Sequence, residues 1–253
     1  CGKPDAHWIG VSMKTYCKPK TVNIEDAGFN SVAVHLGFSG KLRKDEFQKL
    51  LISTGKITQA ELDEELRNNS CLKTLEAIDA VAENLTQLIR ERDLQLRPVF
   101  SFQRRDGISQ KLRDLNSETA EQQLYEYMAH HALEPLFKAK ILPCQCGSIP
   151  GRGQIGAKRQ LERILRKKFH CENLDEVKCD VRHAYQSVTV ECVMTLLRRD
   201  IGKNKPLLWF VEACMSNYPD GRLMIGGYLP TWLFNYVMSY VLRYLLSLYK
   251  SRR

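Results

Sequence analysis

The cysteines of this chain lack the spacing of a common metal knuckle. There are nine of them, an odd number, and the closest two, Cys144 and Cys146, are separated by a single residue. No basic-then-apolar segment of the kind that directs secretion opens the sequence. The pattern predicts reduced thiols in a cytoplasmic protein. A zinc site built from Cys144, Cys146, His170 and Cys171 is the alternative, although its spacing departs from Cys-x2-Cys.

Low-complexity segments and internal repeats are also lacking. Hydrophobic residues make up 43% of the 253 residues and charged residues 26%, which is typical of a folded globular chain and excludes a disordered one. The first residue is Cys1, and a helical pattern runs without a cap into Ser251-Arg-Arg253. We therefore expect a fragment of a longer protein.

Acidic residues are too few to balance the basic ones. Lysine and arginine number 38 against 29 aspartates and glutamates, which gives a net charge of +9. This balance favours a polyanionic partner, nucleic acid first and an anionic membrane second. A basic surface that is merely solvated is the alternative.

Charge is absent altogether between Leu223 and Leu242, a stretch of twenty residues. Its length is about enough to cross the hydrocarbon core of a bilayer, so a membrane-spanning helix is one interpretation. However, Gly226, Gly227 and Pro230 lie near its start, and its aromatic residues are spread along it rather than gathered at its ends. We predict a buried helix entered through a glycine loop, and no membrane partner.

Helical patterns dominate the rest of the chain after residues 1–55, which show no strong periodicity. Thr58 and Glu61 have the spacing of a capping box ahead of a short charged helix. Aliphatic residues at helical spacing then predict one buried face of a helix that ends near Arg92. That face consists of Leu75, Ile78, Val81, Ala82, Leu85, Leu88 and Ile89. Later helices are predicted from Ser117 to about Leu133 (interrupted by Pro135), Ile155 to Lys168, Thr189 to near Gly202 and Pro206 to Met215.

Two regions favour β-strands. Residues 97–102 are typical of an edge strand because Pro98 cannot donate to a β-ladder, and a second short extended piece carries Lys111 and Arg113 after a polar turn. Residues 177–181 alternate apolar and charged side chains, which predicts a half-buried strand. Its odd positions would face the core, and Asp180 would face out.

Two stretches in the second half of the chain carry a resemblance. Lys178-Cys-Asp-Val-Arg-His-Ala-Tyr-Gln-Ser-Val188 has an aspartate, four residues and then an aromatic before a small and an aliphatic residue. Ile225-Gly-Gly-Tyr-Leu-Pro-Thr-Trp-Leu-Phe-Asn-Tyr236 has a glycine pair leading into a helix with an asparagine. They resemble the first catalytic motif and the second palm motif of reverse transcriptases. Pro230 and Thr231 depart from the Ser-Gln common in that family.

Upstream segments extend the resemblance to about residues 74–250. Lys111-x-Arg113, the Gln122-Gln123 pair and Leu133-Glu-Pro-Leu-Phe137 resemble the fingers. Gly147-Ser-Ile-Pro-Gly-Arg-Gly-Gln154 is similar to the glycine-arginine segment before the palm helix in enzymes of bacterial retroelements and group II introns. These motifs stand in the family's order and at its spacing, so together they are a far stronger signal than any one of them.

The resemblance implies a role for each matching residue. Asp180 would be the catalytic carboxylate and a ligand of Mg²⁺, with the Val181 carbonyl as a second ligand. Tyr185 would be the steric gate that rejects ribonucleotides, and Lys111 and Arg113 would hold the triphosphate of a dNTP. A surface aspartate in a strand-to-helix turn and an exposed basic pair are the alternatives.

A basic cluster stands out independently of any family. Its residues are Arg152, Lys158, Arg159, Arg163, Arg166, Lys167 and Lys168, against a single acid, Glu162. Positions 159, 163 and 166 fall on one stripe of the predicted helix, a suitable track for the phosphates of an RNA template or DNA primer. A solvated helix face is the alternative.

No adjacent pair of aspartates occurs anywhere in the sequence. We therefore expect the third palm motif and the thumb of the family to lie outside this fragment. We expect an α+β fold with a helical N-terminal region at residues 1–73, polymerase right-hand fingers at 74–170 and a partial palm at 171–253. The resemblance implies an RNA-directed DNA polymerase domain that is inactive by itself, because one carboxylate cannot close a two-metal site. A non-catalytic RNA-binding protein on the same scaffold and a membrane-anchored basic protein are the alternatives.

Overall fold

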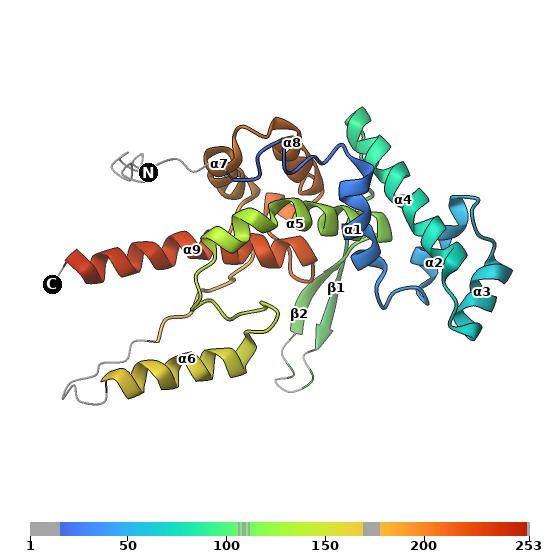
Figure 1. The fold of residues 1–253 in the computed structure, drawn as a ribbon. Coiled ribbons are helices and arrows are strands. Elements are labelled where there is room, and N and C mark those ends of the chain that lie inside the picture. The colour runs from blue at the N-terminus through green and yellow to red at the C-terminus, as the bar shows by residue number, and fades with distance from the viewer. Residues whose placement is uncertain (1–15, 106, 108–109, 111, 169–177, 252–253) are drawn as a thin grey trace.

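The computed structural model describes residues 16–105, 107, 110, 112–168 and 178–251. Its N-terminal region is helical, and the longest of these helices, α4, packs against α1 and also contacts α2 and α3 (Figure 1). The bounds are α1 (Ala27–Phe38), α2 (Asp45–Ser53), α3 (Gln59–Asn68) and α4 (Leu72–Glu91). The region without sequence periodicity thus contributes two helices, α1 and α2.

Local sequence accounts for α3 and α4. The side chain of Thr58 caps the Glu61 N–H, and the Glu61 carboxylate accepts from the Thr58 N–H at 2.8 Å, so the predicted capping box is confirmed. The apolar face of α4 is buried as predicted except at Leu75, which is 42% exposed, and at Leu88, which is half-buried. The buried stripe of the first turn runs instead through Thr74 and Ala77, three residues apart, which leaves Leu75 beside it.

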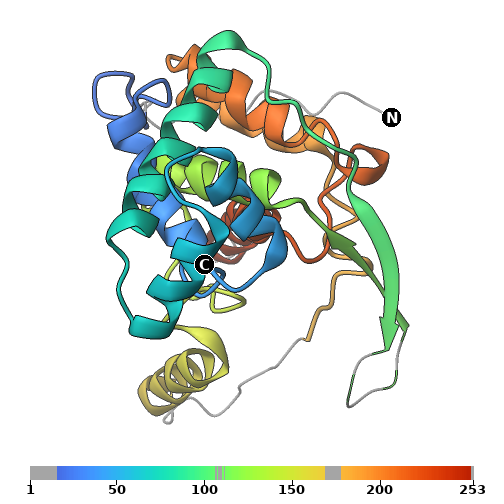
Figure 2. The ribbon, with the colours of Figure 1, turned by 90° about the vertical axis from the view of Figure 1, so that its right-hand side faces the viewer.

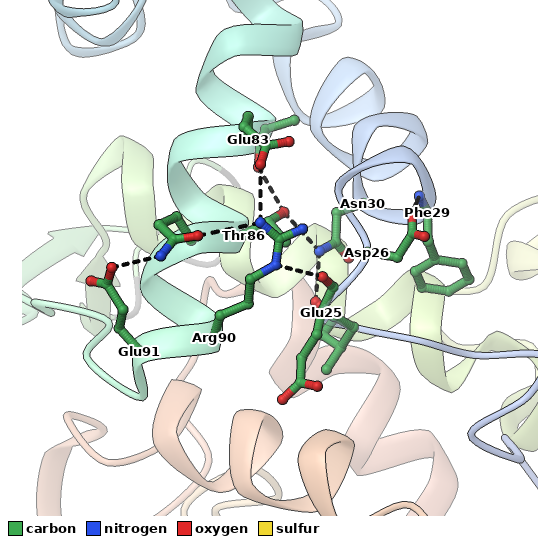
Figure 3. A network of polar contacts seen from close by, with 11 residues as sticks. Glu25, Asp26, Phe29, Asn30, Glu83, Thr86, Arg90 and Glu91 are labelled. Atoms are coloured by element: carbon green, nitrogen blue, oxygen red, sulfur yellow. Dashed lines mark hydrogen bonds and ion pairs between the residues drawn. The ribbon is translucent and has the colours of Figure 1, made fainter.

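Polar contacts join α1 to α4 (Figure 3). The Asn30 side chain, which is fully buried, donates to the Ile24 carbonyl at 2.8 Å and to Thr86 Oγ1 at 2.9 Å. At the surface, Arg90 Nε donates to the Glu25 carbonyl at 2.8 Å. These bonds tie the chain that enters α1 to the last turns of α4, and both NH groups of the buried amide have partners.

A β-hairpin follows, made of β1 (Phe100–Arg105) and β2 (Leu112–Ser117), which pair antiparallel. The predicted extended segments are therefore present, but the first begins at Phe100, because Pro98 lacks an N–H and stays outside the ladder. Every residue of β1 is exposed. At its far end β2 is joined to a distant segment, since the Asn116 N–H donates to the Ile225 carbonyl at 3.1 Å.

The helix α5 (Ala120–Lys140) is the central element, and it contacts α1, α2, α8 and α9. The predicted start at Ser117 and end near Leu133 are wrong. Thr119 is the N-cap, and Pro135 lies inside the helix. The helix continues past the proline because Leu136 and Phe137 are buried in the core, which offsets the loss of one backbone hydrogen bond.

The C-terminal half is again helical, apart from one irregular segment. Its elements are α6 (Gly153–Lys168), α7 (Val190–Ile201), α8 (Lys205–Cys214), the short 3₁₀ helix η1 (Pro219–Gly221) and α9 (Tyr228–Ser251). The predicted helices agree with α6, α7 and α8 to within two residues. Both α6 and the hairpin project from the same side of the helical body (Figures 1 and 2).

The helix α9 begins after a glycine loop and is buried at Leu229, Leu233 and Tyr236, so the predicted buried helix is confirmed for its first turns; its later turns are exposed, for example at Val241 and Leu245. At Tyr236 it joins a buried polar network. Asp200, at the end of α7, accepts from the Tyr236 hydroxyl at 2.9 Å and from Lys140 Nζ at 3.1 Å. The lysine lies on α5, so the network ties three helices together through groups that satisfy one another.

The described residues form a mixed α+β fold that is mostly helical, with one small two-stranded sheet. This confirms the predicted fold class in its coarse form. Within the part of the chain that the structure describes, no helix is both long enough and apolar enough to cross a membrane.

Candidate functional site

The end of the first motif-like segment, residues 186–189, lies against residues 222 and 223, which lead into the second. The Leu223 N–H donates to the Val188 carbonyl at 3.0 Å, and Thr189 and Arg222 form an isolated antiparallel bridge. The guanidinium of Arg222 also donates to the Gln186 carbonyl at 2.7 Å. Residues far apart in the sequence therefore meet here through backbone hydrogen bonds.

Tyr185 is held on the first turns of α9. Its ring stacks on Phe234 with centroids 4.9 Å apart and planes at 25°. Its hydroxyl is 3.5 Å from Thr231 Oγ1, a long and weak hydrogen bond. The ring is half-buried, so one part of it packs on the helix and another part is accessible to a ligand.

Asp180 lies on an irregular, exposed segment. The strand predicted at residues 177–181 is wrong for its described part: residues 178–181 have no regular secondary structure. Val181, predicted to face the core, is 44% exposed. The physical reason is pairing, because a strand needs a neighbour for its backbone groups and no described strand runs alongside this one. Val177 itself lies outside the described residues.

The described residues do not complete a metal site. No three His, Cys, Asp or Glu side chains gather among them in a way that could hold an ion. Asp180 and the Val181 carbonyl alone are too few ligands for the octahedral shell of Mg²⁺. Of the alternative zinc ligands, His170 and Cys171 lie outside the described residues. Cys146 is buried and accepts from Gln160 Nε2 at 3.4 Å.

The hairpin formed by β1 and β2 carries the predicted triphosphate ligands. It shares a cavity with Gln186, the residue after Tyr185. Lys111 lies outside the described residues, while Arg113 lies in β2 opposite Arg104 in the register. A cavity of about 350 Å³ lies between the hairpin, which contributes Gln103 and Asp114, and residues of the 219–225 segment, and Gln186 is also part of its wall.

The basic residues of the predicted cluster, in α6 and just before it, divide into two groups. Arg152 is half-buried and donates to the carbonyls of Leu142 and Gln145 at 2.8 and 3.1 Å, so it fastens the preceding loop. The other predicted nucleic-acid ligands are exposed; they are Lys158, Arg159, Arg163 and Arg166. Lys158 lies 3.9 Å from Glu162, whereas the three arginines form no ion pair with any described residue.

Sequence reasoning missed a buried acid pair, Glu118 and Glu126. Glu126 accepts from the Tyr218 hydroxyl at 2.6 Å and from the Leu229 N–H at 2.9 Å, so a carboxylate caps the first turn of α9. Burial and the neighbouring Glu126 raise the pKa of Glu118 to about 9. An acid among apolar residues of a helix was the one available signal, and it pointed to Glu126 rather than to its partner.

Comparison with known proteins adds no relative. No protein-family model matches the chain, and a search of curated proteins finds no sequence with significant similarity. The functional interpretation therefore depends on the residues and their geometry.

Proposed function

We propose that this chain is the fingers and part of the palm of an RNA-directed DNA polymerase, a reverse transcriptase. The observation that carries the proposal is the contact between the two motif-bearing segments. Tyr185 stacks on Phe234, and the Val188 and Leu223 backbones are bonded, although nothing in the local sequence requires them to meet. A polymerase needs this meeting, because the carboxylate segment and the loop under the nucleotide must share one site.

In this proposal the incoming nucleotide binds at the exposed part of the Tyr185 ring. Asp180 lies five residues before it on an exposed segment, where its carboxylate is accessible to a cation. A divalent ion at such a site would polarise a phosphoryl oxygen. The described residues supply only one of the carboxylates that this chemistry requires, so the partial site would bind weakly and would not turn over.

The template end would lie along α6. Arg159, Arg163 and Arg166 recur at three- and four-residue spacing, are exposed and form no ion pair with a described residue. Such a stripe supports binding to the phosphates of an RNA template or its DNA primer without reading their sequence. The same observation supports the second candidate, an RNA-binding protein that performs no catalysis.

Primer extension separates the two candidates. The measurement is dNTP incorporation on an RNA template with Mg²⁺, by this chain and by the full product of its gene. We expect no extension by the chain and extension by the full product, which Asp180→Asn should abolish. A full product that binds RNA but never extends a primer would favour the non-catalytic candidate.

Asp220→Asn is a matched control for the Asp180 substitution. Asp220 is an exposed aspartate of η1 on the segment that meets the Asp180 motif. Loss of extension in Asp180→Asn with retention in Asp220→Asn would tie catalysis to Asp180. Equal loss in both variants would mean that the substitutions act through general charge or folding.

A further inference from the structure

The glycine loop at residues 226–227 is fixed at both of its ends by elements far from it in the sequence. Before the loop, the Asn116 N–H of β2 donates to the Ile225 carbonyl at 3.1 Å. After the loop, the Leu229 N–H donates to Glu126 Oε2 at 2.9 Å. Glu126 lies on α5, which packs against α9 (Figure 1), so a side chain of one helix caps the start of another.

The start of α9 has no side-chain cap of its own. A glycine precedes the helix at position 227, so no side-chain oxygen is present there to accept from the first N–H groups. Pro230, the third residue of the helix, has no N–H and needs no partner. Leu229 is fully buried, so water cannot replace the carboxylate as the acceptor of its N–H. The bond to Glu126 is therefore the one that satisfies this group.

The two oxygens of Glu126 have separate partners. Oε1 accepts from the Tyr218 hydroxyl at 2.6 Å and from Gln122 Nε2 at 3.5 Å, whereas Oε2 accepts from the N–H of α9. Because three donors converge on Glu126, it is the ionised acceptor of the acid pair, and the proton lies on Glu118, which is bonded to it. Lys41, which is half-buried, supplies a positive charge to both acids. A change at Tyr218 can thus remove one bond of the carboxylate and leave the bond to α9.

The first turns of α9 carry the contacts of Tyr185. The Thr231 hydroxyl, which accepts from the Tyr185 hydroxyl at 3.5 Å, itself donates to the Gly227 carbonyl at 3.1 Å. Phe234, about one turn further along, stacks on the Tyr185 ring. A shift of the first turns of α9 would therefore move both contacts of Tyr185.

We propose that Glu126 is a positioning residue for the nucleotide site. By fixing the Leu229 N–H, its carboxylate sets where the first turns of α9 lie, and so where the Tyr185 ring lies. Glu126 belongs to the proposed fingers and Tyr185 to the proposed palm, so this chain of contacts couples the two. The effect on nucleotides rests on the proposed function, whereas the effect on Leu229 does not.

The first test needs no substitution. Amide hydrogen exchange of this chain is measured at single residues by NMR. Leu229 and Glu46 are each the second residue of their helices, and α2 has no side-chain cap. After correction for intrinsic rates, we expect the Leu229 N–H to exchange at least about tenfold more slowly than the Glu46 N–H, because its acceptor is a charged group. Similar corrected rates would overturn the proposal.

Substitutions then separate the bond to α9 from general stability. Glu126→Met keeps the length of the side chain but has no acceptor, whereas Glu126→Gln keeps one acceptor oxygen. Relative to amides of α4, Leu229 should exchange at least about tenfold faster in Glu126→Met and near the wild-type rate in Glu126→Gln. Tyr218→Phe is the matched control, because it removes the bond to Oε1 alone and should leave Leu229 protected. Equal loss of protection in Glu126→Met and Tyr218→Phe would refute the specific role of Glu126.

Glu126→Asp serves if circular dichroism shows that Glu126→Met does not fold. Its carboxylate keeps the charge but lies about one carbon–carbon bond nearer α5, beyond hydrogen-bonding distance of an N–H that is 2.9 Å from Oε2 in the wild type. We expect the same loss of protection at Leu229. Full protection of Leu229 in a folded Glu126→Asp would contradict the proposal.

The same variants are compared in the full product of the gene by their incorporation of rNTP and dNTP. Glu126→Met should raise the ratio of rNTP to dNTP by about three- to tenfold, because a misplaced Tyr185 ring excludes the 2′-hydroxyl less well. Glu126→Gln and Tyr218→Phe should leave the ratio unchanged. An unchanged ratio in Glu126→Met, with faster exchange at Leu229, would refute the positioning of Tyr185.

The two measurements separate this inference from the polymerase proposal. If Leu229 is protected only when Glu126 is present, but the full product never extends a primer, the polymerase is refuted and the role of Glu126 at α9 is supported. If the full product extends primers and Glu126→Met leaves both the exchange of Leu229 and the rNTP to dNTP ratio unchanged, the positioning role alone is refuted.

Discussion

The N-terminal helices and α6 differ in how far their side chains satisfy one another. In α1–α4 the buried amide of Asn30 has partners for both its NH groups, although its Oδ1 accepts no hydrogen bond from a described residue, and the carboxylate of Glu61 is bonded to a cap and to Lys73. On α6, Leu161 is 57% exposed and Ile164 is 55% exposed, on a helix whose arginines are free of described ion pairs. The packing of α1–α4 within the chain is enough to explain where their side chains lie.

The difference between α1–α4 and α6 indicates which part of the molecule would bind a partner. An exposed helix with both an apolar and a basic face gains little from folding by itself, because neither face is taken out of water. The N-terminal helices, by comparison, contribute to the core through Val34, Phe38 and Leu62. We propose that the first region serves stability and that α6 and Tyr185 serve binding.

Matched leucine truncations test this contrast with the largest expected effect. Leu62 on α3 is fully buried, whereas Leu161 on α6 is exposed. Leu62→Ala should lower the free energy of unfolding by about 2–5 kcal/mol, and Leu161→Ala should change it by no more than about 0.5 kcal/mol. Chemical denaturation measures both, and similar losses in the two variants would mean that α6 is packed.

The binding side of the contrast is tested by salt dependence. Replacing Arg159, Arg163 and Arg166 by Ala should lessen the slope of log affinity against log salt for RNA by up to about 3, near one per phosphate contact. The control variant removes equal charge from the exposed Lys18, Lys20 and Lys203. If both triple variants change the slope equally, binding follows net charge rather than the stripe.

Glycine substitutions compare two loops. A Cβ at Gly227 would meet Glu118 Oε1 at 2.5 Å and Pro230 Cγ at 2.7 Å, whereas one at Gly147 meets nothing within 4 Å. Gly227→Ala should therefore cost about 1–3 kcal/mol through overpacking, and Gly147→Ala should be nearly neutral. Thermal unfolding gives the order, and a neutral Gly227→Ala would show that the loop moves freely.

The acid pair predicts a smaller effect that depends on pH. The pKa of Glu118 is about 9 in the folded protein, against an ordinary value of 4.5. Between these values the unfolded state binds fewer protons, so the free energy of unfolding falls as the pH rises through this window. Relative to Glu118→Gln, which does not titrate, the wild type should lose at least about 1 kcal/mol from pH 5 to pH 8.5. Parallel profiles would contradict the raised pKa.

Elements governed by local signals were predictable from sequence. The Thr58–Glu61 cap, the helix closed at Gly202 and the glycine loop before α9 depend on neighbouring residues, and the structure has them all. The strand at Asp180 depended on a pairing partner elsewhere, and the continuation of α5 past Pro135 depended on tertiary burial. Alternation and proline patterns carry neither kind of information.

The candidate site divides in the same way. Tyr185 and its neighbours could be found from the order of residues, but their contact with Phe234 could not. Glu118 carried no sequence signal, because its burial beside Glu126 and close to Gly227 is a tertiary arrangement. The functional groups hardest to predict are those created by tertiary contacts.

The most direct test of the polymerase proposal is sugar discrimination at Tyr185. In the full product of the gene, Tyr185→Ala should raise rNTP incorporation relative to dNTP by at least about tenfold. A single methylene group in a pocket changes discrimination between two substrates by about 10–200-fold, and an aromatic ring fills more space than a methylene. Tyr185→Phe, which keeps the ring that stacks on Phe234, should leave the ratio unchanged. An equal ratio of rNTP to dNTP incorporation in the wild type and Tyr185→Ala would contradict the proposal. Tyr185 would then be a residue that only packs against α9.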